Sequence, residues 1–226
     1  MSAEERPLRA DAERNRRRLL EAASAMFSER GLDVGVGEIA ERAGVGRGTL
    51  FRNFASKEDL IAAIVVERMN EVVALGRELL DTGDPGDTLF TFIEETAGRQ
   101  QVDRAMFESV ADTFMANEGI RAAYAAIVET VGLLLQRAQA SGAVRADVSA
   151  VDVMMMVKGA CQAATSFQMV DPEIGVARQL DLVRAALSAP AATRPLRGRT
   201  PSVEDLERAF PSSEPAAAHR ARSAPA

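Results

Sequence analysis

Apolar residues recur at intervals of three and four along most of the chain, which is the spacing of one face of an α-helix. The first series ends at Gly31, and a short series over residues 36–43 ends at Gly44. No segment alternates between apolar and polar residues for long enough to predict a β-strand. The pattern therefore predicts an all-α protein of about nine helices. The helices expected after the first two are a short one at 47–53 and longer ones at 57–81, from 85 past 93, from 102 or 103 to 114, at 117–142, at 149–169 and at 173–188.

Residues that cap helices stand at several of these predicted starts. An oxygen-bearing side chain just before a helix accepts a hydrogen bond from a free backbone N–H of the first turn. An acidic residue three positions later strengthens the signal, and proline is well tolerated at the first helical position. The predicted starts with such a residue are at Ser56, Asp84 (followed by proline), Asn117, Ser149 and Asp171 (followed by proline).

The window 36–55 predicts two short helices joined by a tight turn. The helices of a helix-turn-helix cross steeply, so a small residue is needed where they approach and a residue tolerant of positive φ is needed in the turn. Ala40 and Gly44 meet these two needs. Ile39, Val45 and Leu50 are the apolar residues expected to form the core beneath the turn. The window therefore predicts a helix-turn-helix.

The chain resembles the TetR family of transcriptional regulators in the stretch L-L-E-A-A-S-A-M-F-S-E-R-G and then in I-A-E-R-A-G-V-G-R-G-T-L-F-R-N-F-A-S-K-E-D-L. The resemblance covers about residues 15–65, and the remainder matches only as a divergent helical domain. It implies a homodimer that binds a palindromic operator as a repressor and is released by a small-molecule ligand. The expected organisation is a flexible arm at 1–12, a DNA-binding domain at 13–60, a ligand-binding and dimerisation domain at 61–189 and a disordered tail at 190–226.

The helix at 47–53 is expected to lie in the major groove as the recognition helix. Arg47 is the candidate for a bidentate contact with guanine, whose two acceptors match a guanidinium. Thr49 is expected to reach a phosphate or a thymine methyl, and Gly48 to allow close approach of the backbone. Phe51 and Phe54 are expected in the core. The other residues assigned to the DNA-binding surface are Arg16, Arg17, Gly37, Arg52, Asn53 and Lys57.

Some positions depart from the family pattern. Gly35 and Gly46 stand where the family commonly has Ser or Thr caps, at a cost of a few tenths of a kcal/mol each. Phe51 and Asn53 stand where it often has tyrosines, and a phenyl ring lacks the hydroxyl that reaches phosphate. Gly37 replaces a polar side chain that often helps to contact DNA. A helical dimerisation or adaptor protein with a degenerate helix-turn-helix therefore stays open as the alternative function.

The region 61–189 offers apolar surface but does not identify a ligand. The side chains expected to line an effector pocket are Phe92, Phe107, Phe114 and Met115. The last two helices are expected to form a four-helix dimer interface, with an apolar seam of Leu180, Val183 and Leu187. Cys161 has no basic residue close by in the sequence and is expected to be a small buried hydrophobe.

The composition argues against most kinds of catalytic site, and the charges are distributed unevenly along the chain. His219 is the only histidine and Cys161 the only cysteine, so a histidine-based triad, a paired-cysteine metal site and cofactor chemistry are not expected. The net charge of −6 conceals a balance of 11 basic and 11 acidic residues over 1–60, and 10 basic against 18 acidic over 61–189. No apolar run approaches the roughly 20 residues of a membrane span and no signal peptide is recognisable, so a cytoplasmic protein is expected. Residues 190–226 hold six of nine prolines and little to bury.

Overall fold

The computed structural model describes residues 5–109, 117–166, 172–189, 195–196, 198–202 and 205, with the side chains of 5–10, 100–109, 164–166 and 172–174 left aside. The described residues form eight helices and no strand, apart from one isolated bridge, so the predicted all-α class is confirmed. The helices are α1 (Glu5–Arg30), α2 (Val36–Arg42), α3 (Arg47–Asn53), α4 (Lys57–Leu80), α5 (Pro85–Ser109), α6 (Glu118–Ala140), α7 (Ala150–Ser166) and α8 (Pro172–Leu187).

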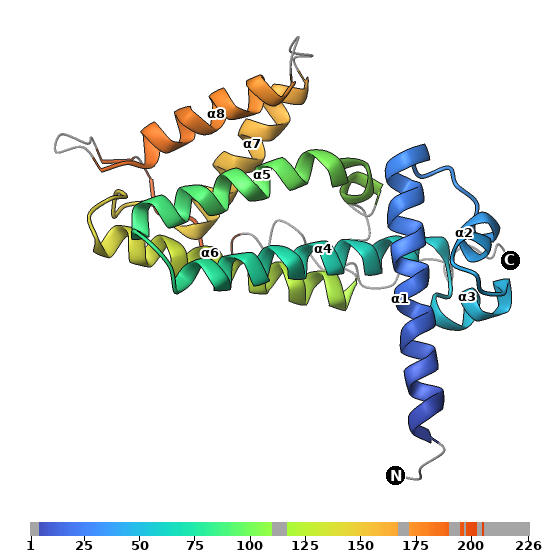
Figure 1. Cartoon of the computed structure of the whole chain (residues 1–226). Helices are drawn as coiled ribbons and strands as arrows, with labels where there is room; N and C mark the ends of the chain where they lie inside the picture. Colours follow the sequence, from blue (N-terminus) through green and yellow to red (C-terminus); the bar gives the residue numbers. More distant parts are fainter. Residues whose placement is uncertain are drawn as a thin grey trace, which may run out of the picture.

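The helices divide into a small head and a larger body (Figure 1). In the head, α1 crosses the first part of α4, and α2 and α3 lie together against α1. Helix α4 then runs out of the head into the body, where it packs along α5 and α6. Helices α7 and α8 pack on each other and against α5. We use "head" for α1–α3 with the first half of α4, and "body" for the rest of the described chain.

Each part has its own hydrophobic core. Leu19, Ile39, Leu50 and Leu60 are at most 1% exposed and belong to the head core. Helix α6 contributes the fully buried Ile120 to that same core, although it belongs mostly to the body. A second cluster, built from α5 to α8, fills the body. The head is therefore closed by a residue that lies far along the sequence.

Four of the five helix starts predicted from capping residues are confirmed, and the fifth cap, Asp171, lies outside the described residues. Ser56 and Asn117 each accept a hydrogen bond from the backbone N–H three residues later, at 3.0 Å. Asp84 accepts from the N–H two residues later at 2.9 Å, with proline at the first helical position. Ser149 and Asp152 exchange hydrogen bonds of 2.8 and 3.2 Å between side chain and backbone. Capping side chains therefore mark half of the eight described helix starts.

Two boundaries differ from the prediction. Helix α5 is continuous from Pro85 to Ser109, so the expected new start at 102 or 103 is wrong, and the described chain has eight helices where nine were expected. An aspartate acts as a cap only where the preceding backbone has left the helix, and Gly98 keeps a helical backbone here. Helix α1 begins at Glu5, so residues 5–12 of the predicted flexible arm are helical.

Close backbone approaches set the geometry of the body. A Cβ atom on Gly76 of α4 would collide with the methyl group of Thr130 on α6 and would lie 3.0 Å from the Phe92 ring on α5. At the far end of the body, an antiparallel bridge joins Val144 to Ser188 and ties the α6–α7 turn to the end of α8. Glycine at position 76 therefore lets three helices meet at one point.

Candidate nucleic-acid interface

The turn between α2 and α3 depends on one glycine. Gly44 has φ of +65°, a conformation that residues with a Cβ rarely adopt. Its neighbour Val45 donates to the Ala40 carbonyl at 3.0 Å and packs, half-buried, on the head core. Ile39 and Leu50 are at most 1% exposed beneath the turn. The five residues assigned to the helix-turn-helix core thus lie together at this turn.

Ion pairs fasten α2 to the end of α1. Arg42 makes two hydrogen bonds to the Glu29 carboxylate, at 2.6 and 2.7 Å. Arg30 donates to Glu38 at 2.6 Å, and Glu38 also accepts from the Gly35 N–H at 3.3 Å. The hydrogen bond from Arg42 lowers the pKa of Glu29, and the hydrogen bond from Arg30 lowers the pKa of Glu38. Glu38 therefore satisfies the backbone N–H of the N-cap residue, while the glycine itself offers no side-chain oxygen to the first turn of α2.

One face of α3 is open to solvent. Arg47, Gly48, Phe51 and Arg52 are exposed along it, whereas Leu50 points into the core. Phe51 is 51% exposed, so its expected place in the core is wrong, while Phe54 is 3% exposed as expected. Positions 47, 48, 51 and 52 share a face because residues three and four apart on a helix are neighbours. This face presents the guanidinium groups of Arg47 and Arg52, the uncovered backbone at Gly48 and the phenyl ring of Phe51.

The position of the Arg47 guanidinium depends on the absence of a side chain at Gly37. A Cβ atom on Gly37 would collide with the Arg47 guanidinium, which rests in the space left by the missing side chain. A Cβ atom placed on Gly48 would have open space within 4 Å, apart from its two chain neighbours and the backbone of its own helix. Gly37 thus belongs to this surface by making room for Arg47, and Gly48 by leaving the backbone open.

The remaining polar residues of α3 bond to their own helix. Arg52 donates to the Gly48 carbonyl and to the Thr49 hydroxyl, both at 3.1 Å. Asn53 donates to the Thr49 carbonyl at 2.8 Å. Arg52 is exposed, so its guanidinium keeps further donors for a ligand. Asn53 and Thr49 are half-buried and act first within the helix.

The other three cations assigned to the DNA-binding surface are Lys57, Arg17 and Arg16. Lys57 donates to the Leu32 carbonyl, and its amino group lies 5.9 Å from the centre of the Phe27 ring. Arg17 is exposed on α1. Arg16 is half-buried and donates to the carbonyl of Asn53 at 3.4 Å. Lys57 and Arg16 are therefore both half-buried and bound to the protein, whereas Arg17 is exposed.

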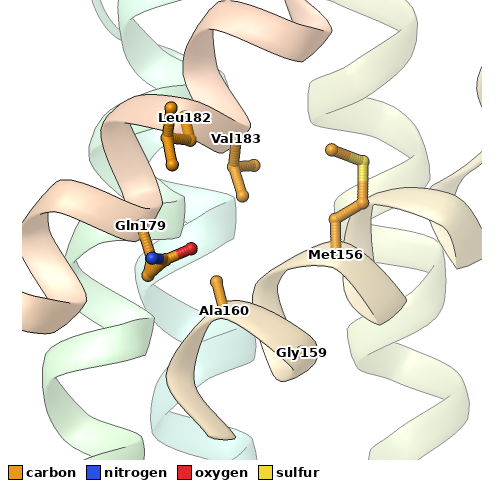
Figure 2. A pocket seen from close by; sticks show the side chains of 6 residues that line it. All are labelled: Met156, Gly159, Ala160, Gln179, Leu182 and Val183. Atoms are coloured by element: carbon orange, nitrogen blue, oxygen red, sulfur yellow. The ribbon is translucent and has the colours of Figure 1, made fainter. Parts of the chain in front are cut away.

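The body holds a shallow cavity of about 240 Å³ between α7 and α8 (Figure 2). Figure 2 shows Met156 and Ala160 of α7 opposite Gln179 and Val183 of α8. Phe92, expected in an effector pocket, does not line it: this side chain is 3% exposed inside the body core. Its helical spacing indicated an apolar face, and the neighbouring helices fill the space in front of that face.

The expected dimer seam lies inside the protomer. Leu180, Val183 and Leu187 are 8%, 6% and 0% exposed, and all three belong to the body core. Periodicity showed that α8 has an apolar face, and that face covers α5 and α7 of the same chain. Among the described side chains of α7 and α8, the large apolar residues that remain open are Met155, 61% exposed, and Leu182, 57% exposed. Sequence analysis missed both, because single apolar residues outside the main stripe give no periodic signal.

Sequence comparison assigns both parts of the chain. Residues 19–64 match the family described as "Bacterial regulatory proteins, tetR family", and residues 84–189 match the family described as "Transcriptional regulator SbtR-like, C-terminal domain". A TetR transcription regulatory protein from Mycobacterium vanbaalenii, known from a crystal structure, is 33% identical with a TM-score of 0.60. That similarity covers 80% of this chain and 99% of the other. The chain belongs to the TetR family.

Other TetR-family relatives agree. A TetR transcriptional regulator from Streptomyces coelicolor is 29% identical with a TM-score of 0.59, over 78% of this chain and 99% of that one. An HTH-type transcriptional regulator of Staphylococcus aureus is 33% identical over 75 residues, which are 33% of this chain and 40% of that relative. The protein is a TetR-family transcriptional regulator with a helix-turn-helix DNA-binding domain, and not an enzyme.

Several expectations for this TetR-family protein fall outside the described residues. Phe114, Met115 and most of 190–226 are among them, as is the side chain of Phe107. Within the described part, Cys161 is a buried thiol whose pKa is raised by burial. None of the described helices has the length and apolar character needed to cross a membrane.

Proposed function

We propose that this regulator is a repressor that binds a palindromic operator as a homodimer and leaves it when a small molecule binds the body. The observation that carries the proposal is the exposed face of α3, where Arg47 stands between two glycines. A guanidinium next to bare backbone suits the edge of a guanine in the major groove, because the helix can come close to the base.

Phosphate contacts from the flanks of α3 complete the DNA-binding surface. Lys57 uses one of its three N–H donors on the Leu32 carbonyl and keeps two for phosphate. Arg17 of α1 and Arg52 of α3 are exposed as well. Such contacts fix the position of the head on the duplex, while Arg47 distinguishes the sequence.

A homodimer through α7 and α8 accounts for the apolar residues left open there. Met155 and Leu182 expose more than half of their surface, and Leu182 borders the cavity of about 240 Å³. A second copy of the same surface, related by a two-fold axis, would bury both residues and pair one head with each half of a palindrome. The apolar seam proposed here is therefore Met155 and Leu182 in place of the buried residues of α8.

Release by an effector requires that the body and the head be mechanically linked. Helix α4 runs through both, and Ile120 at the start of α6 is part of the head core. A molecule that binds one arrangement of α4 and α6 better than another shifts the head to that arrangement. The match of residues 84–189 to a regulator C-terminal domain supports an effector site in the body.

Selection of genomic DNA fragments bound by the purified full chain tests the operator. We expect enrichment of a palindromic sequence, and we expect Arg47→Ala to weaken binding to it by about 1–3 kcal/mol while relaxing one position of the site. Arg77→Ala is the control, because it removes the same charge from an exposed part of α4 in the body. Unchanged affinity of Arg47→Ala in a gel-shift titration would remove Arg47 from the interface. No enriched fragment would favour the helical adaptor.

Mass measured by light scattering tests the dimer. We expect the native chain to be dimeric and Leu182→Glu to be monomeric, because a carboxylate in an apolar interface loses its hydration without gaining a partner. Leu133→Glu is the matched control, since Leu133 is 45% exposed on α6, outside the proposed seam. If both variants stay dimeric, the interface lies elsewhere.

A further inference from the structure

Two successive arginines of α1 have different surroundings. Arg17 is exposed, whereas the Arg16 guanidinium packs on the end of α3. It donates to the Asn53 carbonyl at 3.4 Å, and its central carbon lies 4.5 Å from the centre of the Phe54 ring. Asn53 is the last residue of α3 and Phe54 is its C-cap. One side chain of α1 therefore holds two successive residues at the end of the recognition helix.

These contacts suit arginine in particular. The last carbonyl groups of a helix carry partial negative charge that a cation stabilises. A planar guanidinium stacks on an aromatic ring and donates hydrogen bonds in its own plane at the same time, which an ammonium group does not. Phe54 is 3% exposed, so its ring is a fixed platform for the stack.

The recognition helix needs such an external restraint. Helix α3 has seven residues, and helices this short are not stable without tertiary contacts. Leu50 anchors its middle in the core, and the glycine at its N-cap contributes no side-chain hydrogen bond. The direction of α3 therefore depends on what holds its C-terminal end, and Arg16 is in contact with that end.

Arg16 also faces the helices that lead into the body. It borders a cavity of about 400 Å³ together with Glu67 of α4 and with Asn117 and Gly119 at the start of α6. Burial raises the pKa of Glu67, and the positive charge of Arg16 opposes that rise, so the two side chains interact electrostatically. A shift of α4 or α6 would change the surroundings of the guanidinium.

We propose that Arg16 does not contact DNA and instead is a positioning residue, which fixes the direction of α3 and makes it depend on α4 and α6. Arg16 is half-buried and its guanidinium is directed at Asn53 and Phe54, whereas Arg17 is exposed. Arg17 has no such attachment to the end of α3 and is the better placed of the two for phosphate. The inference rests on the DNA binding proposed above, and it revises the expectation that both arginines contact DNA.

The salt dependence of operator binding separates the two roles. Each phosphate contact contributes about 0.9 to the slope of log K against log salt concentration. We expect Arg16→Met to weaken operator binding roughly tenfold, because a charge-assisted hydrogen bond and a stack are lost. The slope and the affinity for random-sequence DNA should not change. Arg17→Met, the comparison variant, should weaken both DNAs alike and reduce the slope by about 0.9.

Arg16→Lys gives the decisive comparison. Lysine keeps a charge for phosphate but loses the planar stack, so we expect it to bind the operator as weakly as Arg16→Met. Native-like binding by Arg16→Lys, or a reduced slope in Arg16→Met, would overturn the proposal. Melting curves of each variant exclude unfolding as the cause, and Arg16→Lys decides alone if Arg16→Met does not fold.

Hydrogen exchange without DNA provides an independent arm. We expect the amides in the second half of α3 to exchange faster in Arg16→Lys, while the amides of α2 keep their native rates. Unchanged exchange in α3 would contradict the positioning role. Since this measurement needs no operator, it still decides the inference if the search for an operator fails, which would count against the proposed function alone.

Discussion

The head and the body of this regulator are held together in different ways. Helices α2 and α3 of the head have seven residues each and depend on a glycine turn and on side chains from α1. The described body helices have 16 to 25 residues and pack along their lengths. The short helices α2 and α3 therefore depend on a few specific contacts in addition to the head core, whereas the body helices pack through extended apolar faces. Loss of one contact should matter more for direction in the head and more for stability in the body.

The same comparison shows that the head is not independent. Helix α4 begins in the head and continues through the expected boundary at residue 60 without interruption. Ile120 and Ala123 of α6 close the head core from the other side. Residues of the domain that is proposed to bind the effector therefore form part of the core of the DNA-binding domain.

Ile120→Ala should have the largest effect on this shared core. Ile120 is fully buried, and removing such a side chain from a core lowers the free energy of unfolding by about 3 kcal/mol. We expect urea denaturation of the full chain to show this loss, with faster hydrogen exchange in α2 and α3. Leu133→Ala, on the exposed side of the same helix, should lower it by less than about 1 kcal/mol. Native exchange rates in the head of Ile120→Ala would mean that the head does not depend on α6.

Gly76→Ala should have an intermediate effect, confined to the body. The added methyl group would collide with Thr130, and overpacking of this kind lowers the free energy of unfolding by about 1–3 kcal/mol. Alanine's better helix propensity offsets roughly 1 kcal/mol of that. Gly132→Ala is the control, because nothing lies within 4 Å of its added Cβ. A more stable Gly76→Ala than Gly132→Ala in the same denaturation experiment would rule out the close approach of α4 and α6.

Arg42→Met should have the smallest effect, with a characteristic pH dependence. Arg42 lowers the pKa of Glu29 from its ordinary value of 4.5, so the pair stabilises the folded head above that pH. Its contribution is lost as the pH falls through the lowered pKa, because the carboxylate is then protonated. Thermal melting of native chain and variant should therefore differ slightly at neutral pH and converge in acid. A difference that stays constant down to acid pH would show that packing, and not the charge pair, is responsible.

The fold was predictable where the signal is local. Side chains such as Ser56 and Asn117 mark helix starts through hydrogen bonds within four residues, and Gly44 marks the turn through its own backbone conformation. The break expected at 102–103 failed because a capping residue is also tolerated inside a helix when the preceding backbone stays helical. The helix-turn-helix could therefore be predicted from the sequence residue by residue, whereas the length of α5 could not.

The candidate site was less predictable because it depends on neighbours. The residue type and spacing placed Arg16 and Arg17 in one basic cluster, and only the tertiary structure shows that one of them packs on Phe54. The apolar period of α8 identified Leu180 correctly as covered, but not by which chain. Phe51 had the same ambiguity in reverse, since nothing local tells whether an aromatic residue of a short helix is covered.

The contact between Gly37 and Arg47 makes two positions on different helices dependent on each other. Any side chain at position 37 would occupy the resting place of the guanidinium and push it away from the turn. Under the proposed base contact of Arg47, operator preference depends on this pair of residues, of which one carries a guanidinium and the other has no side chain. Grafting the α3 sequence of this regulator into a relative with a larger residue at the equivalent of Gly37 should consequently fail to transfer its preference, unless the glycine is moved with it.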